Sequence, residues 1–140
     1  MRRFLLAAAL TLAVSPAVAA GPAKKASPEG GHVDVAPFAV PVMIEGRVVN
    51  YVFVSVRLQV APSADPQGLL SKEPRVREAL VRASHRTPMN PPGQRSSVDE
   101  SRLAKVALAE AKRIGGAAFI GAEVRKQTPQ RQLAPLERPG

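Results

Sequence analysis

The residues of this chain that could do catalytic or metal chemistry are few and scattered. There are two histidines, His32 and His85, and no cysteine. No His-x-x-x-His or His-Glu pair occurs, so the ligand spacing of a zinc or metalloprotease site is absent. The lack of cysteine excludes disulfides, thiolate metal sites and lipoprotein attachment. No serine stands in a Gly-x-Ser-x-Gly elbow. We therefore expect no enzyme, no catalytic residues, no metal site and no cofactor.

The acidic side chains have ordinary structural explanations. Asp99 and Glu100 are adjacent, at the expected start of a helix, where carboxylates cap free N–H groups. Glu110 borders the apolar face of that same helix. We expect it to pair with Arg113 or Lys112, because oppositely charged side chains on an exposed helix surface often form ion pairs. No acid, base and nucleophile come together from these residues.

The pattern that stands out is a set of basic residues on two predicted helices. If both helices cover one face of a sheet, their outer surfaces form a common positive patch. A plain solvated surface is the alternative, because charged outer faces are usual on packed helices. The candidate interaction residues are Arg75, Arg77, Arg82 and Arg86 in the first helix and Arg102, Lys105, Lys112 and Arg113 in the second.

A strand over Val48–Val60 is the element on which the others must pack. Its apolar residues alternate, as in a strand with one buried face. Early in the run both faces are apolar, so we expect that half to be covered on both sides. A second apolar run, Phe38–Ile44, precedes it across the short turn Glu45-Gly46-Arg47, and together they predict an antiparallel hairpin. Pro41 lacks a backbone N–H, so we expect the first strand to be an edge strand or to pair on only one side at that position.

Two helices and a last strand follow. Leu69–Arg86 has one apolar stripe at helical spacing, and Ser97–Ile114 begins with a capping box between Ser97 and Glu100. Gly115-Gly116 ends the second helix. Ala117–Gln127 is a strand that returns beside the central one, with its apolar face formed by Ala118, Ile120, Ala122 and Val124. This order predicts an α+β two-layer sandwich with both helices on one face of an antiparallel sheet.

The N-terminal residues have the features of an export signal. Arg2 and Arg3 form a positive start, Phe4–Val14 is a short apolar region, and Ala17-Val18-Ala19 is a cleavage signal. We assign residues 1–20 to a signal peptide, 21–36 to a disordered linker, 37–127 to the α+β domain and 128–140 to a disordered tail. The expected location is the periplasm; retention of the signal as an anchor would instead make the protein membrane-associated.

The charge balance favours acidic partners. Lys and Arg number 20 against 11 Asp and Glu, a net charge of +9. Such a chain is attracted to anionic lipid, to acidic protein surfaces or to nucleic acid. Nucleic acid is disfavoured, because the chain carries an export signal and only 4% of its residues are aromatic and able to stack on bases.

The order and content of these elements resemble the periplasmic domain of the flagellar basal-body-associated FliL family. The similarity covers about Phe38–Gln127, and its most specific part is a helix pattern that this chain matches at Pro74, Val76, Arg77, Glu78, Ala79, Leu80 and Val81. The resemblance implies a stomatin-like fold, no enzymatic activity, and oligomers around the stator units of the flagellar motor. This chain departs from the family in its cleavable-looking signal and its Pro-rich loop Thr87–Ser96.

Two functions follow from these observations. The first is a non-enzymatic periplasmic interaction module, similar to FliL, that binds flagellar motor proteins or another envelope complex and forms homo-oligomers. The second is a basic periplasmic protein that binds anionic lipid or polysaccharide through the Arg and Lys faces of its helices.

Overall fold

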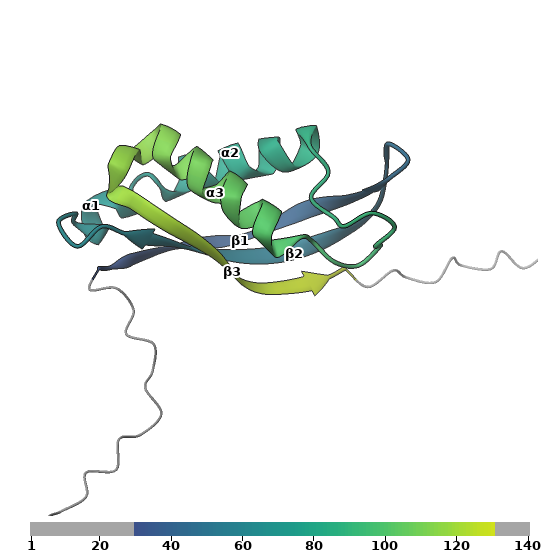
Figure 1. The fold of residues 1–140 in the computed structure, drawn as a ribbon, viewed down its shortest axis with the longest axis horizontal. Coiled ribbons are helices and arrows are strands. Elements are labelled where there is room, and N and C mark those ends of the chain that lie inside the picture. The colour runs from purple at the N-terminus through teal and green to yellow at the C-terminus, as the bar shows by residue number, and fades with distance from the viewer. Residues whose placement is uncertain (1–29, 131–140) are drawn as a thin grey trace, which may run out of the picture.

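The domain is an antiparallel sheet with helices packed on one face. The computed structural model describes residues 30–130. The strands β1 (His32–Ile44), β2 (Arg47–Val60) and β3 (Phe119–Pro129) lie in the order β1-β2-β3, with both pairs antiparallel. The helices α2 (Glu73–Arg86) and α3 (Glu100–Gly115) lie side by side above this sheet (Figure 1). The predicted α+β two-layer sandwich is therefore confirmed.

The core lies between the sheet and the two helices. Alternate residues of β2 supply its centre, and Val52, Val54 and Leu58 have no exposed surface. From above, Leu80 of α2 and Leu103 of α3 are also fully buried. Removing each such side chain from water contributes about 1.5–3 kcal/mol. The apolar faces of the two helices and of the central strand thus pack together in one core layer.

The hairpin turn explains how β1 and β2 pair. Glu45 and Gly46 both have positive φ, 48° and 74°, between the paired residues Ile44 and Arg47. Two central residues with positive φ give a turn whose twist matches that of the two strands. Pro41 is tolerated because β1 is an edge strand of the described sheet, with β2 as its neighbour among residues 30–130. Both features agree with the prediction.

The boundary between linker and domain lies earlier than predicted. β1 begins at His32, so residues 32–36 belong to the sheet and not to the linker. Val33 and Val35 are 1% and 2% exposed, which shows that this short alternation is part of the core. At the other end β3 extends to Pro129. The predicted signal peptide, most of the linker and most of the tail lie outside the described residues.

The helix starts also differ from the prediction. The predicted segment Leu69–Arg86, with Ser71 or Glu73 as the expected cap, corresponds to α2, which begins at Glu73 after Lys72 and has no side-chain cap. A separate short helix, α1 (Pro66–Leu70), precedes it, and Asp65 caps α1 by accepting hydrogen bonds from the N–H groups of Gln67 and Gly68. The residue that caps α3 is Asp99, whose Oδ1 lies 3.0 Å from the backbone nitrogen of Arg102. Ser97 is therefore not the cap, and the predicted capping box is wrong.

A bulge changes the faces of β3. The short 3₁₀ helix η1 (Gly116–Ala118) leads into the strand, and the register shifts where Gln59 and Val60 pair with Gly121 and Phe119. Ile120 is the extra residue at this point, and 44% of it is exposed, whereas Phe119 is 1% exposed. The predicted apolar face is therefore wrong at Ile120, because a bulge reverses the alternation that the sequence pattern assumes.

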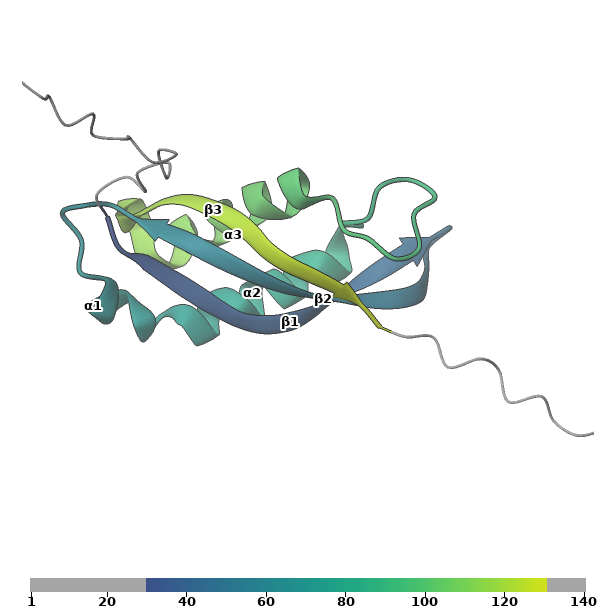
Figure 2. The same ribbon diagram turned by 90° about the horizontal axis from the view of Figure 1, so that it is seen from below.

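The lower face of the sheet is open. Figure 2 shows the strands in front of the helices, with no other described element over that face. On β2, Val48 is 45%, Tyr51 37% and Phe53 46% exposed. We predicted this half of the strand to be covered on both sides, and within residues 30–130 it is not, because the domain has two layers and both helices are on the same one.

Candidate interaction surfaces

A groove runs between α2 and α3 on the helical side of the domain. It is open to solvent and has a volume of about 370 Å³. We call it the interhelix groove. Its lining consists of cationic, anionic and apolar side chains from both helices: Arg75, Glu78, Ala79, Arg82, Arg113 and Ile114.

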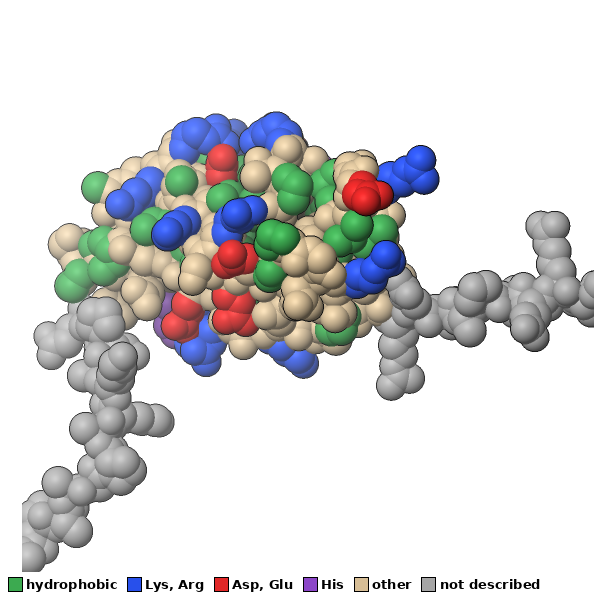
Figure 3. Space-filling model, turned by 45° about the vertical axis from the view of Figure 1, so that its right-hand side comes forward, with side chains coloured by type: hydrophobic (Ala, Val, Ile, Leu, Met, Phe, Trp, Pro, Cys, Tyr) green, Lys and Arg blue, Asp and Glu red, His purple; other side chains and the backbone are tan. Residues whose placement is uncertain are grey.

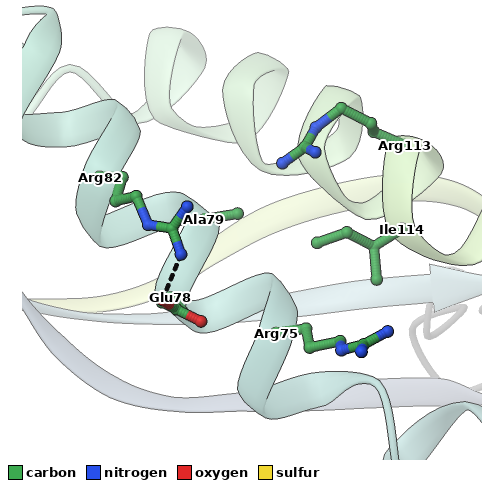
Figure 4. A pocket seen from close by; sticks show the side chains of 6 residues that line it. All are labelled: Arg75, Glu78, Ala79, Arg82, Arg113 and Ile114. Carbon is green, nitrogen blue, oxygen red and sulfur yellow. Dashed lines mark hydrogen bonds and ion pairs between the residues drawn. The ribbon is translucent and has the colours of Figure 1, made fainter.

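The spacing of these residues along α2 explains why they meet. Arg75, Glu78 and Arg82 follow one another at intervals of three and four residues, which places them on the same side of a helix. Arg113 and Ile114 face them from the last turn of α3. In Figure 4 Arg113 extends from α3 toward α2, the guanidinium of Arg82 is turned toward Glu78, and Arg75 extends toward the side of Ile114.

Two of the three arginines already have carboxylate partners. Arg82 is bound to Glu78, one turn earlier on α2. Arg113 donates from Nε to Oε2 of Glu110 over 2.9 Å, which confirms one of the two predicted partners of Glu110. Arg75 has no ion pair or side-chain hydrogen bond within residues 30–130. The groove thus contains one uncommitted guanidinium and two that are held by neighbouring carboxylates.

The other predicted candidates lie outside the groove. Arg77 is directed toward Glu73, with Nε 3.8 Å from Oε1, at the outer edge of β1. Arg102 donates from Nη1 to the backbone oxygen of Pro88 over 3.0 Å. The remaining three are exposed and make no ion pair with any described residue: Arg86, Lys105 and Lys112.

The cationic side chains do not form one continuous patch. Figure 3 shows Lys and Arg along the upper, helical side of the domain, with acidic and hydrophobic side chains among them. The structure therefore brings together Arg75, Arg82 and Arg113, and leaves the other five predicted residues at separate places on the surface.

A second charged cluster crosses the open face of the sheet. Asp34, Arg57 and Glu123 are register partners on the three strands. Arg57 donates two hydrogen bonds to Asp34, and Arg125 donates to Glu123 over 2.6 Å. The hydrogen bonds from Arg57 lower the pKa of Asp34 below its usual value. An open groove of about 410 Å³ is lined by Asp34, Arg57 and Arg125 of this cluster and by Glu73. The cluster has two carboxylates and two guanidinium groups, so these four side chains have no net charge.

The described part of the chain shows neither a metal centre nor a membrane helix. No group of three or more His, Asp or Glu side chains in residues 30–130 is arranged to hold a metal ion. None of the helices in this range is both long and apolar enough to cross a bilayer.

Comparison with known proteins does not assign a family. No protein-family model, curated protein or solved structure matches this chain. The surfaces of the domain are therefore the basis for its proposed function.

Sequence reasoning missed two features of these surfaces. The pairing of Glu78 with Arg82 is visible in the sequence as an i,i+4 spacing, but its effect on the basic groove is not. The exposed aromatic residues Tyr51 and Phe53 were assigned to a covered strand face. No local signal distinguishes a second covered face from an open one, because covering depends on where the helices pack.

Proposed function

We propose that this chain is a non-catalytic interaction module of the cell envelope, similar to the periplasmic FliL domain, and that its interhelix groove holds an anionic group of the partner. The observation that carries the proposal is the convergence of Arg75, Arg82 and Arg113 from two helices on one groove. Guanidinium groups bind carboxylates and phosphates through paired hydrogen bonds, so a concave set of three is a recognition site for an anion.

The shape of the groove favours a discrete anionic group over a membrane surface or a polysaccharide chain. Long anionic surfaces attract continuous cationic faces. Here Glu78 and Glu110 interrupt the positive charge, and the arginines line a concave space. The alternative, in which the whole helical side docks on anionic lipid or polysaccharide, is supported by Arg86, Lys105 and Lys112, which are exposed and form no ion pair within residues 30–130.

Two triple variants test the proposal. The groove variant is R75Q/R82Q/R113Q, and the matched control R86Q/K105Q/K112Q removes three positive charges outside the groove. With full-length protein purified from native cells, we expect envelope proteins that co-purify with the wild type to be retained by the control and lost by the groove variant. Equal recovery with both variants would overturn the groove as the contact.

The same pair of variants tests the alternative function. Vesicles with anionic lipid would bind the wild type in a salt-sensitive manner if the helical side docks on membranes. In that case the control variant would lose at least as much binding as the groove variant, because the exposed cations lie outside the groove.

The association with the flagellar motor needs a test in cells. A strain deleted for this gene should lose swimming, and wild type but not the groove variant should restore it. Normal swimming of the deleted strain would contradict a role in the motor, and the partner would then be another envelope protein.

A further inference from the structure

We propose that the interhelix groove selects a phosphomonoester dianion over a carboxylate. This inference rests on the proposed function, in which the groove holds an anionic group, and it names the chemical class of that group. Its basis is the pair of carboxylates that the domain itself places beside the arginines.

The two internal carboxylates weaken binding of any further carboxylate. Arg82 is paired with Glu78, and Arg113 with Glu110. If a carboxylate ligand displaced Glu78 from Arg82, Arg82 would lose one singly charged carboxylate partner and gain another. The exchange gains little, because exposed ion pairs of this type contribute little to begin with. Of the three groove arginines, only Arg75 could bind such a ligand without first losing a carboxylate partner within residues 30–130.

A phosphomonoester differs in charge and in shape. It has a charge of about −1.5 to −2 at neutral pH and three strong acceptor oxygens. Three oxygens allow one group to accept from Arg75 and, at the same time, from Arg82 and Arg113 on opposite sides of the groove. Arg113 already extends from α3 toward α2, whereas Arg82 is turned toward Glu78 and would have to leave it to reach the phosphate (Figure 4). The added charge compensates for the displacement of both internal carboxylates.

The apolar part of the lining indicates what carries the phosphate. Ala79 and Ile114 lie beside the arginines. With about 370 Å³ available, the groove has room for a phosphate group and a compact hydrocarbon or aromatic group attached to it. A phosphomonoester with an apolar substituent fits this mixture better than inorganic phosphate alone.

The internal carboxylate of Glu78 is then a competitor of the ligand. Replacing it with an uncharged amide frees Arg82 and removes a negative charge from the groove. E78Q should therefore strengthen phosphate binding. A Glu78 that served only to hold the helix together would have no such effect, so this variant separates the two roles.

Titrations with two probes of the same ring test the selection. Phenyl phosphate and benzoate are each titrated into full-length protein at pH 7.5 and low salt, with affinity measured by calorimetry or by NMR shifts. We expect phenyl phosphate to bind about tenfold more tightly than benzoate, and R75Q to weaken it about tenfold, as for the loss of a charge-assisted contact. E78Q should tighten it about twofold to tenfold by removing the competing charge.

The control is R77Q, which removes the same charge from α2 at a position outside the groove. Circular dichroism melting shows whether each variant is folded. R77Q should bind phenyl phosphate as the wild type does. If benzoate binds as tightly as phenyl phosphate and R75Q weakens both, the selection is overturned while the anion site of the proposed function stands. If neither probe binds, or R75Q binds like R77Q, the inference is overturned, and the co-purification experiment decides the proposed function separately.

Vesicles distinguish the sources of the phosphate. Phosphatidic acid presents a phosphomonoester, whereas phosphatidylglycerol presents a diester with a single charge. Binding to phosphatidic acid alone, lost in R75Q, would support the inference and assign a lipid headgroup. Binding of phenyl phosphate without binding to either vesicle would support a soluble phosphomonoester. Equal binding to both vesicles, unchanged by R75Q, would overturn a headgroup site in the groove.

Discussion

Arg57 holds Asp34 across the pairing of β1 and β2 with two parallel hydrogen bonds, 2.7 Å from Nε to Oδ1 and 3.1 Å from Nη2 to Oδ2. These bonds favour the charged carboxylate, so the pKa of Asp34 in the folded domain lies below its usual 3.8. His32 adds a weaker contact at 3.7 Å. The stability of the domain in acid should therefore depend on the ionisation of Asp34 on the open face of the sheet.

The sign of this linkage gives a prediction for pH. Because the folded pKa of Asp34 is the lower one, its stabilising contribution is complete above about pH 4 and is lost as the pH falls through the folded pKa. NMR titration of the Asp34 carboxyl should show a midpoint below 3.8 in wild type and a higher one in R57Q. Equal midpoints in both proteins would contradict the role of Arg57.

Gly115 is needed for the packing of Phe119. A Cβ added at Gly115 would lie 2.3 Å from Cε2 and 2.7 Å from Cδ2 of the Phe119 ring, which is 1% exposed. We expect G115A to lower the free energy of unfolding by about 1–3 kcal/mol, as overpacking does. Urea denaturation measures this change.

The control for Gly115 is Gly68 in α1. A Cβ there would meet only Asp65, at 3.4 Å or more, an ordinary contact. G68A should be neutral or slightly stabilising, because alanine favours helices. If G115A proves as stable as G68A, the close approach to Phe119 does not constrain the domain.

The two faces of β2 should respond differently to truncation. Leu58 has no exposed surface, and L58A should cost about 2–5 kcal/mol in the free energy of unfolding. Phe53 faces the opposite side and is 46% exposed, so F53A should cost about 1 kcal/mol or less. Chemical denaturation of both variants checks the difference. A larger loss for F53A would show that the open face is covered in solution.

Asn90 closes the outer edge of β1. Its side chain accepts a hydrogen bond from the N–H of Met43 and donates one to the oxygen of Met43, each over 3.0 Å, and the residue is 5% exposed. N90A should destabilise the domain by about 1–3 kcal/mol, because it leaves partly buried backbone groups of Met43 unpaired. Amide hydrogen exchange of Met43 should accelerate in N90A. N50A, which removes an exposed contact to Arg95, is the control and should leave that amide protected.

Most of the secondary structure could be predicted because its signals are local. The alternation along Val48–Val60 depends only on the period of a strand, and the stripe of α2 only on the period of a helix. The turn at Glu45-Gly46 follows from short-range backbone conformation. The antiparallel hairpin, the edge position of β1 and the two-layer arrangement follow from these local elements and their order.

The errors occur where local signals compete. Ser97 and Asp99 both have the side chain of a helix cap, and the contact with the Arg102 N–H selects Asp99. Val33 and Val35 alternate over too few residues to stand out after a stretch rich in Gly and Pro. Ile120 belongs to a regular pattern in the sequence, and a register shift against β2 removes it from the core.

The sequence by itself determined the α+β class, the order of the elements and the basic character of both helices, because composition and periodicity act over a few residues. Only the tertiary structure decided which arginines meet. Arg75 and Arg113 are far apart in the chain, and the helical spacing that places Arg75 and Arg82 on one side of α2 does not show that this side faces Arg113 of α3. The packing of α2 against α3 determines which residues of each helix line the groove. The placement of both helices on one side of the sheet leaves its other face open. Both depend on contacts between distant segments of the chain, which no local sequence pattern specifies.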